Sequence, residues 1–170
     1  MNLVTCLLLL AASILIADEP STPLGQAFQI NTPWKAHAGD DLRWAQPDFD
    51  DSSWQSDKEL PAINGLAWYR MTVRLPDAAA PLGLWMPHVL KSAEFFVNGQ
   101  KIGNHGSLEK WYLERRDLVD PMRLPAGLRS GDLLHIAVRV NRTISGPGIA
   151  GKPVIGAWHA VYAEHQQELM

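Results

Sequence analysis

The sequence has a single cysteine, Cys6, and it lies within an apolar run at the N-terminus. Without that run the chain has no cysteine, which excludes a disulfide, a thiol nucleophile and a thiolate metal ligand. An excess of positive charge is also lacking, since the formal net charge is −3 and the pI is about 6.0. Because nucleic-acid-binding domains usually carry a basic patch and a high pI, we expect no nucleic-acid partner.

The N-terminal segment lacks charge altogether. Residues 1–17 contain no charged side chain, and their apolar centre, residues 7–16, is too short to span a bilayer. The acidic pair Asp18 and Glu19 follows at once. This pattern predicts a secretory signal peptide cleaved after Ala17, and therefore a periplasmic or secreted protein. Since no Lys or Arg precedes the apolar run, the signal is atypical or the true start lies upstream; a buried N-terminal strand or helix is the alternative.

The remaining chain is long enough for one domain with a substantial core. We divide it into a mobile leader at residues 18–29, a β-sandwich at residues 30–155 and a helical tail at residues 156–170, which is expected to lead toward a membrane segment. Apolar residues make up 46% of the sequence, a typical share for a globular protein.

Turn and strand signals favour an all-β fold. Asn98-Gly99 is a strong hairpin signal, because a type I′ turn needs positive φ at both central residues. Apolar and polar side chains alternate over residues 69–75 and 133–140, which predicts half-buried strands. Residues 112–124, interrupted by Pro121, are expected to form an irregular edge strand. From Trp158 onward, apolar residues recur at helical spacing. The expected fold is an antiparallel jelly-roll β-sandwich with a short C-terminal helix.

Several motifs are weak as reactive or cofactor sites. Residues 146–151 match GxGxxG, but no strand runs directly into the glycines and a βαβ unit is lacking, so a loop is expected. The six histidines show no metal spacing and are expected to be structural or surface residues. We predict no cofactor and no metal. An acidic cluster comprises Asp40, Asp41, Asp48, Asp50 and Asp51. We expect these aspartates to form turns and helix caps, and calcium binding is the less favoured alternative.

The sequence gives little support for catalysis. The G-x-S-x-G elbow of serine hydrolases is missing. A glycosidase would need two carboxyl groups across a cleft, and Glu94, Glu109 and Glu114 stay open as candidates, but the sandwich pattern offers no cleft floor. We therefore predict no catalytic residues. The sequon at Asn141 matters only in a eukaryotic secretory pathway.

An ordered set of motifs resembles a known family. The motifs are residues 49–54 (FDDSSW), 68–70 (WYR), 97–103 (VNGQKIG), 124–125 and 131–140. In this order they resemble the galactose-binding-like jelly-roll domain, best known as the sugar-binding domain of family 2 glycoside hydrolases. The resemblance covers about residues 30–150 and implies a non-catalytic β-sandwich. It supplies no ligand, because this fold hosts many binding activities.

The resemblance occurs in two settings, and three functions follow. The preferred prediction is a periplasmic input module of a larger membrane signalling protein that binds a ligand, with carbohydrate as the candidate class. An export signal and a helical end fit that setting. The alternative is the accessory sugar-binding domain of a β-galactosidase-type enzyme. A protein-interaction module without a small ligand is the third.

The candidate ligand site combines aromatic and charged side chains. Sugars stack on flat aromatics, and neighbouring polar groups hydrogen-bond their hydroxyls. Trp111, Tyr112, Glu114 and Arg115 supply both kinds of group in one short stretch, and Trp34 is expected to add a second wall. The alternative is that Trp111 anchors a loop to the core.

Overall fold

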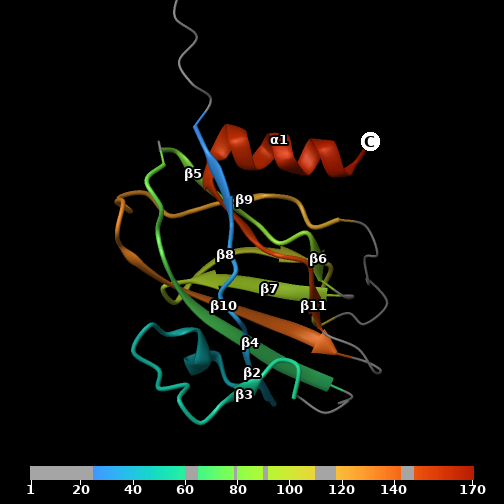
Figure 1. Ribbon diagram of the computed structural model, residues 1–170. Helices are drawn as coiled ribbons and strands as arrows, with labels where there is room; N and C mark the ends of the chain where they lie inside the picture. Colours follow the sequence, from blue (N-terminus) through green and yellow to red (C-terminus); the bar gives the residue numbers. More distant parts are fainter. Residues whose placement is uncertain (1–24, 60–64, 79, 90–91, 110–117, 143–147) are drawn as a thin grey trace, which may run out of the picture.

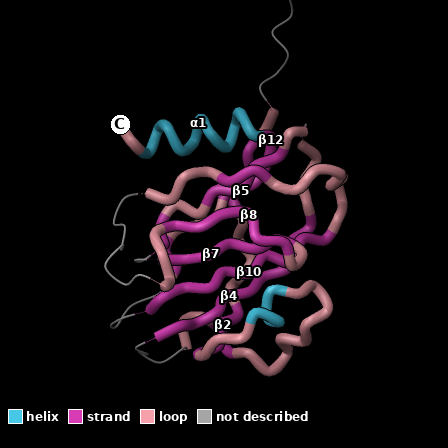
Figure 2. The backbone as a smooth tube through the Cα atoms, turned by 180° about the vertical axis from the view of Figure 1, so that it is seen from behind, coloured by secondary structure: helices cyan, strands magenta, loops and turns pink. Residues whose placement is uncertain are grey.

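The computed structural model describes residues 25–59, 65–78, 80–89, 92–109, 118–142 and 148–170. All strand pairs are antiparallel. Figures 1 and 2 show the strands of the larger sheet side by side below the C-terminal helix. In spatial order this six-stranded sheet comprises β3 (Gln55–Ser56), β2 (Lys35–Ala38), β4 (Gly65–Arg74), β10 (Leu133–Arg142), β7 (Ser92–Val97) and β8 (Gln100–His105).

A second sheet faces the first. Its four strands, in spatial order, are β1 (Ala27–Gln29), β12 (Val154–Ala157), β5 (Leu82–Trp85) and β9 (Met122–Arg123). A small ladder joins β6 (His88–Val89) to β11 (Ile149–Ala150). The predicted all-β antiparallel sandwich is confirmed. Strand pairing begins at Ala27, three residues before the predicted start of the sandwich, and continues to Ala157.

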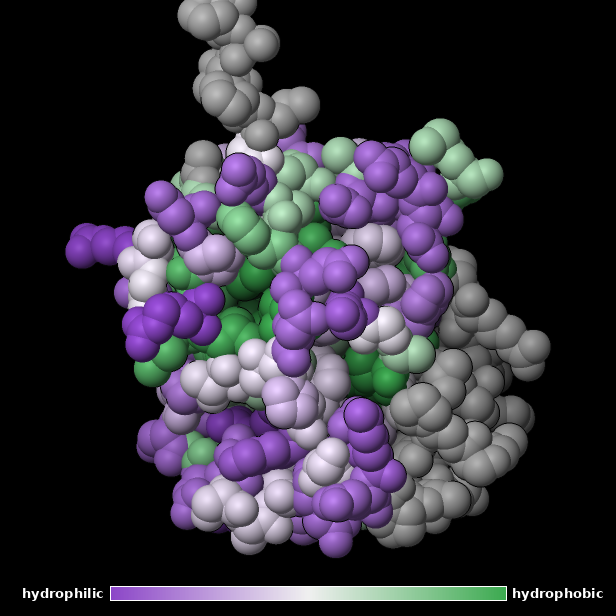
Figure 3. Space-filling view, viewed as in Figure 1, coloured by the Kyte–Doolittle hydropathy of each residue, from purple (hydrophilic) through white to green (hydrophobic). Residues whose placement is uncertain are grey.

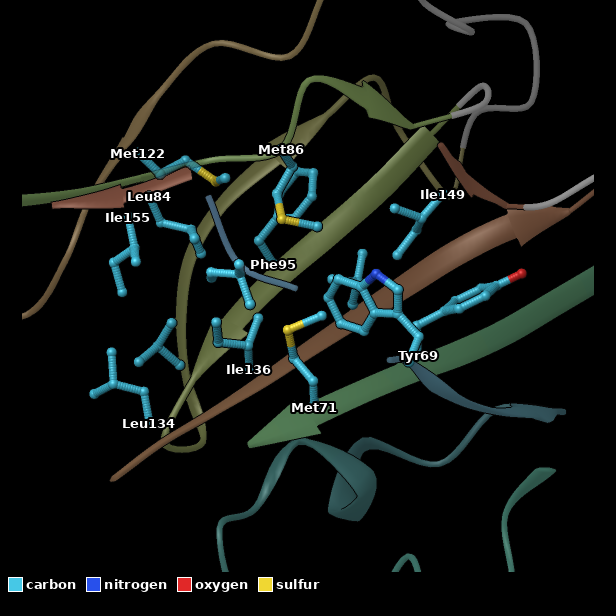
Figure 4. Packing of buried hydrophobic residues seen from close by; sticks show 14 of the residues in the cluster. Tyr69, Met71, Leu84, Met86, Phe95, Met122, Leu134, Ile136, Ile149 and Ile155 are labelled. Carbon is cyan, nitrogen blue, oxygen red and sulfur yellow. The ribbon is translucent and has the colours of Figure 1, made fainter. Parts of the chain in front are cut away.

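The core lies between the two sheets and follows the predicted alternation. Tyr69, Met71 and Val73 of β4 lie opposite Val138, Ile136 and Leu134 of β10 in register, and all six are buried. Figure 4 shows side chains of this cluster from both sheets meeting. Burying a large aliphatic side chain contributes about 1.5–3 kcal/mol, so these rows stabilise the sandwich strongly.

The hairpin at Asn98-Gly99 is confirmed. Both residues have positive φ, 49° and 81°, and the turn joins β7 to β8. The Asn98 N–H donates to the His135 carbonyl at 2.9 Å, and the Asn98 side chain accepts the His135 N–H at 2.8 Å. The turn is thus tied to β10 as well. The second arm of the hairpin, β8, runs to His105.

The outer face of the larger sheet is covered, where the sequence pattern predicts a solvent-facing surface. The 3₁₀ turn η1 (Leu42–Ala45) and the following loop lie over it. Trp54, Trp68 and Phe96 form a second buried cluster there, with Trp44 and Phe49 packed against it. Trp68 and Phe96 stack with ring centroids 5.4 Å apart. Arg70, assigned by alternation to the polar face, is buried beneath this layer with 3% of its surface exposed.

The predicted C-terminal helix is confirmed as α1 (Trp158–Glu168). It packs on the four-stranded sheet, with Val161 fully buried and the ring of Trp158 against Gly83. Among the described residues, no helix has the length and apolar character needed to cross a membrane.

The glycine-rich stretch and the predicted edge strand are described only in part. Gly148 precedes β11, which pairs with β6, so this part of the GxGxxG stretch belongs to an antiparallel ladder. A dinucleotide-binding βαβ unit would need a parallel sheet there. Within residues 118–124, only Met122 and Arg123 form the predicted edge strand, beside β5.

Candidate functional site

A pocket of about 520 Å³ opens at the start of β2, the strand that pairs with β3 on one side and β4 on the other. We call it the β2 pocket. Its apolar lining is supplied by Pro33, Trp34, Trp54 and Met71. Its polar lining is supplied by Thr32, Lys35, Asp51, Ser56, Arg70 and Thr72. A concave site with apolar walls and a few polar groups is the usual form of a small-molecule site.

Trp34 forms the inner wall of the β2 pocket. Only 7% of its surface is exposed, and its ring meets Tyr69 edge-on with centroids 6.4 Å apart. The Trp34 carbonyl accepts the Asp57 N–H at 3.1 Å, which extends the pairing of β2 with β3. Trp34 therefore anchors the pocket to the core and presents only an edge to a ligand. Its predicted role as a second wall of the ligand site around Trp111 stays a prediction.

Arg70 organises the floor of the β2 pocket. Its Nε donates to Asp51 Oδ2 at 2.9 Å, Nη1 donates to the carbonyls of Trp44 and Gln46, and Nη2 donates to the carbonyl of Phe49. The guanidinium carbon also lies 5.4 Å from the centroid of the Phe49 ring. One buried side chain thus holds three carbonyls of the covering loop and one carboxylate of the pocket.

Asp51 joins the two cations of the pocket. Its Oδ1 accepts a hydrogen bond from Lys35 Nζ at 2.7 Å, and its Oδ2 accepts one from Arg70. Burial raises the pKa of Asp51, but hydrogen bonds and charge attraction from Lys35 and Arg70 outweigh it, so the pKa lies below its ordinary value. The carboxylate is therefore ionised at neutral pH and offers a fixed acceptor.

Local turn chemistry places Asp51. Asp50 Oδ1 accepts the Ser52 N–H at 2.9 Å, and the Asp51 carbonyl accepts the Trp54 N–H at 3.1 Å. These bonds close the tight turns that Asp and Ser favour. They bring the Asp51 side chain to Arg70 on the outer face of the larger sheet. They also bring the Trp54 ring against Trp44, with ring centroids 5.3 Å apart.

The remaining aspartates of the acidic cluster are largely engaged. Asp41 accepts the Arg43 N–H at the start of η1, and Asp40 accepts hydrogen bonds from Arg139 Nε at 2.7 Å and Trp68 Nε1 at 3.2 Å. Hydrogen bonds to Arg139 outweigh burial and lower the pKa of Asp40. These are turn, capping and ion-pair roles. No group of three metal-ligating side chains occurs within the described ranges.

Arg139 links Asp40 to a second ion pair on the same face. Its Nη1 donates to Glu94 Oε2 at 3.0 Å, and Lys101 Nζ contacts Glu94 Oε1. Burial raises the pKa of Glu94, but hydrogen bonds from Lys101 and Arg139 lower it overall. We name the four side chains Asp40, Arg139, Glu94 and Lys101 the charge ladder. Both carboxylate oxygens of Glu94 are thus engaged in ion pairs.

The predicted stretch at Trp111, Tyr112, Glu114 and Arg115 lies outside the described residues, so its role stays a prediction. Lys35, Asp51 and Arg70 were not predicted as site residues. The signal was nevertheless present, because Asp51 and Arg70 sit in the two motifs, FDDSSW and WYR, that carry the family resemblance. Because the Arg70 side chain is buried in the folded protein, its charge needs a carboxylate as partner, and Asp51 supplies it.

Two smaller hollows were compared with the β2 pocket. One of about 320 Å³ lies at the end of α1 beside His88 and Glu168. One of about 350 Å³ is lined largely by apolar residues near Leu82 and Leu124. Apolar side chains also gather in the hollow below α1 in Figure 3, whereas the region around β2 and β3 is more polar. Only the β2 pocket combines aromatic walls with charged and hydroxyl groups among these three.

Comparisons with known proteins were made for sequence and for structure. No protein-family model matches the chain, and no curated protein matches it by sequence. Solved structures do match. A β-glucuronidase of Bacteroides uniformis is 24% identical, with a TM-score of 0.59 over 77% of this chain. The sandwich fold is shared with family 2 glycoside hydrolases.

Two other solved structures show the same fold. A family 2 glycoside hydrolase from Bacteroides cellulosilyticus is 19% identical with a TM-score of 0.59, over 76% of this chain and 20% of that one. A Ruminococcus gnavus β-glucuronidase is 12% identical with a TM-score of 0.59, over 78% of this chain and 28% of that one. The Bacteroides uniformis match covers 18% of its enzyme. The chain therefore spans less than a third of each enzyme, and at these identities the likeness shows the fold.

Proposed function

We propose that this chain is a non-catalytic, carbohydrate-binding accessory domain of the family 2 glycoside hydrolase type. The observation that carries the proposal is the match of about three quarters of the chain to less than a third of such enzymes. This supports the accessory-domain alternative above the periplasmic input module. The input module remains a prediction based on the N-terminal segment, which lies outside the described residues, and on the helical end.

The β2 pocket supports carbohydrate as the ligand class. It presents hydroxyl groups of Thr32, Ser56 and Thr72 next to an ionised acceptor and an ammonium donor, Asp51 and Lys35. A polyol needs donors and acceptors in close alternation above an apolar wall. No carboxyl pair suited to glycoside hydrolysis lines this pocket, because Asp51 is its one acidic residue among those described.

Sugar binding to the β2 pocket is tested by a substitution that fills the pocket with a large side chain. In Thr72→Trp an indole replaces an exposed, pocket-lining side chain, and Ser130→Trp places the same group on an exposed turn away from the pocket. Sugar-induced changes in amide resonances of Ser56 and Met71 should occur in the unmodified protein and Ser130→Trp, and should vanish in Thr72→Trp. Unchanged binding by Thr72→Trp would show that sugars bind elsewhere.

The predicted site around Trp111 makes a competing claim that the same measurement decides. Trp111→Ala should abolish sugar binding with little loss of stability if that stretch forms the site. If instead it unfolds the domain, Trp111 is a core anchor. If it leaves both binding and stability intact while Thr72→Trp abolishes binding, the β2 pocket is the site.

The non-catalytic part of the proposal has its own test. Release of nitrophenol from nitrophenyl β-glucuronide and β-galactoside should stay at the level of buffer in the presence of this chain. Turnover that persists in the purified protein and follows its concentration would contradict an accessory role.

A further inference from the structure

The β2 pocket carries an uneven charge. Its lining holds two cations, Lys35 and Arg70, against the single carboxylate of Asp51. Asp50 lies just outside the lining and is turned toward the Ser52 N–H. The lining itself therefore has one net positive charge.

Only one of the two cations is accessible to a ligand. Arg70 uses four of its five N–H groups within the protein and is 3% exposed. The Lys35 side chain is 45% exposed. Its Nζ donates to the carbonyl and to Oδ1 of Asp51, which leaves one of three N–H groups for another acceptor.

We infer that the β2 pocket selects saccharides that bear an anionic group, such as a uronic acid, over neutral ones, with Lys35 Nζ as the group that contacts the anion. This inference rests on the proposed carbohydrate-binding function. Trp34 and Trp54 supply apolar lining for a sugar ring, and Ser56 and Thr72 supply hydroxyl groups for hydrogen bonds to it. An anion next to Lys35 takes up the Nζ N–H group that Asp51 leaves free.

The inference is tested with three probes that differ in one group: D-glucuronate, D-glucuronamide and D-glucose. Glucuronamide keeps the shape of the acid and removes its charge. Titration followed by amide resonances of Ser56 and Thr72 should show glucuronate binding about three- to fivefold more tightly than either neutral sugar at low salt, as expected for a half-exposed ion pair. The preference should shrink at about 0.5 M salt, where exposed charges are screened.

Matched lysine variants assign the preference to one side chain. Lys35 and Lys101 are 45% and 46% exposed, and each pairs with a carboxylate that is 20% exposed. Lys35→Gln should abolish the preference for glucuronate, so that glucuronate and glucuronamide bind with equal affinity. Lys35→Arg, which keeps the charge, should retain the preference for glucuronate. Lys101→Gln, the matched control, should leave that preference unchanged.

The outcomes separate the two claims. Equal binding of glucuronate and glucuronamide, or an unchanged preference in Lys35→Gln, overturns the anion selectivity while sugar binding stands. Absence of any shift with all three sugars overturns the carbohydrate-binding function and the selectivity with it.

Discussion

Arg70 shows how one side chain can hold a whole layer of this protein. The loop over the outer face of the larger sheet has few regular backbone pairings, and Arg70 supplies donors to three of its carbonyls. An unpaired buried carbonyl costs about 1–3 kcal/mol. The layer therefore depends on the fork shape of the guanidinium as well as on its charge.

Arg70→Lys should destabilise the protein by about 3 kcal/mol, because an ammonium cannot reach Asp51 and three carbonyls at once. The free energy of unfolding from urea titrations measures this. Arg74→Lys is the matched control, since Arg74 lies in the same strand, is exposed and donates to one carbonyl, that of Gly131. It should cost about 0.5 kcal/mol or less. Equal costs for the two variants would contradict the role of Arg70.

At the scale of elements, we expect Gly156 of β12 to be a position that tolerates no larger side chain. β12 is a central strand, paired with β1 and β5. Gly156 has a φ of 156°, and an added Cβ would lie 2.1 Å from the Gln26 carbonyl oxygen. Gly65, at the start of β4, has a similar φ of 140°, but an added Cβ there meets nothing within 4 Å.

Gly156→Ala and Gly65→Ala therefore share a backbone strain of about 1–3 kcal/mol and differ in the clash. We expect Gly156→Ala to cost at least about 2 kcal/mol more than Gly65→Ala, because the obstructing atom belongs to the backbone of the neighbouring strand. Thermal melting of the two variants measures the difference. Similar melting temperatures would mean that β1 moves aside without cost.

Elements with strong local patterns could be predicted from the sequence. Alternation identified β4 and β10, the Asn98-Gly99 turn identified β7 and β8, and helical spacing identified α1. The aromatics of residues 44–54 predict a short helical turn pinned to the sandwich, but not the face that it covers, because alternation separates the two faces of a strand without showing what lies on either. Trp34 was recognised as a candidate, whereas Lys35, Asp51 and Arg70 meet only through folding, since Arg70 is nineteen residues from Asp51. A charged residue in an alternating strand is otherwise read as solvent-facing.

At the scale of the whole molecule, the free energy of unfolding should fall in acid because partly buried ion pairs lose their carboxylate charges. The pKa values of Asp40, Asp51 and Glu94 are lowered by their arginine and lysine partners. A carboxyl group whose pKa is lower in the folded state stabilises the fold above its unfolded pKa, about 3.9 for Asp and 4.3 for Glu, and this contribution disappears as the pH falls through the folded value.

These three carboxyl groups should therefore leave the urea concentration at the unfolding midpoint nearly constant from about pH 7 to pH 5. Below about pH 4.5 the midpoint should fall steadily. Glu94→Gln removes one carboxylate of the charge ladder, so its stability should be lower at neutral pH and decline less steeply in acid. A Glu94→Gln profile parallel to that of the unmodified protein would show that the ladder contributes nothing to acid sensitivity.

Export can be measured on the whole chain. When the full sequence is expressed in a bacterium with a periplasm, the mature protein is expected to begin at Asp18, because cleavage is predicted after Ala17. Cell fractionation followed by N-terminal sequencing tests this. Recovery of an intact N-terminus from the cytoplasm would contradict the signal-peptide prediction.

The pairing of β1 with β12 joins residues 27–29 to residues 154–156. Translation delivers the first of these strands long before the second, and β12 is also the strand that connects β1 with β5. While the ribosome is still working, the larger sheet can already assemble from β2 through β10, but one side of its core stays open to water until Ala157 has emerged. A nascent chain that stalls shortly before that point leaves the β12 edge of β5 without its partner strand.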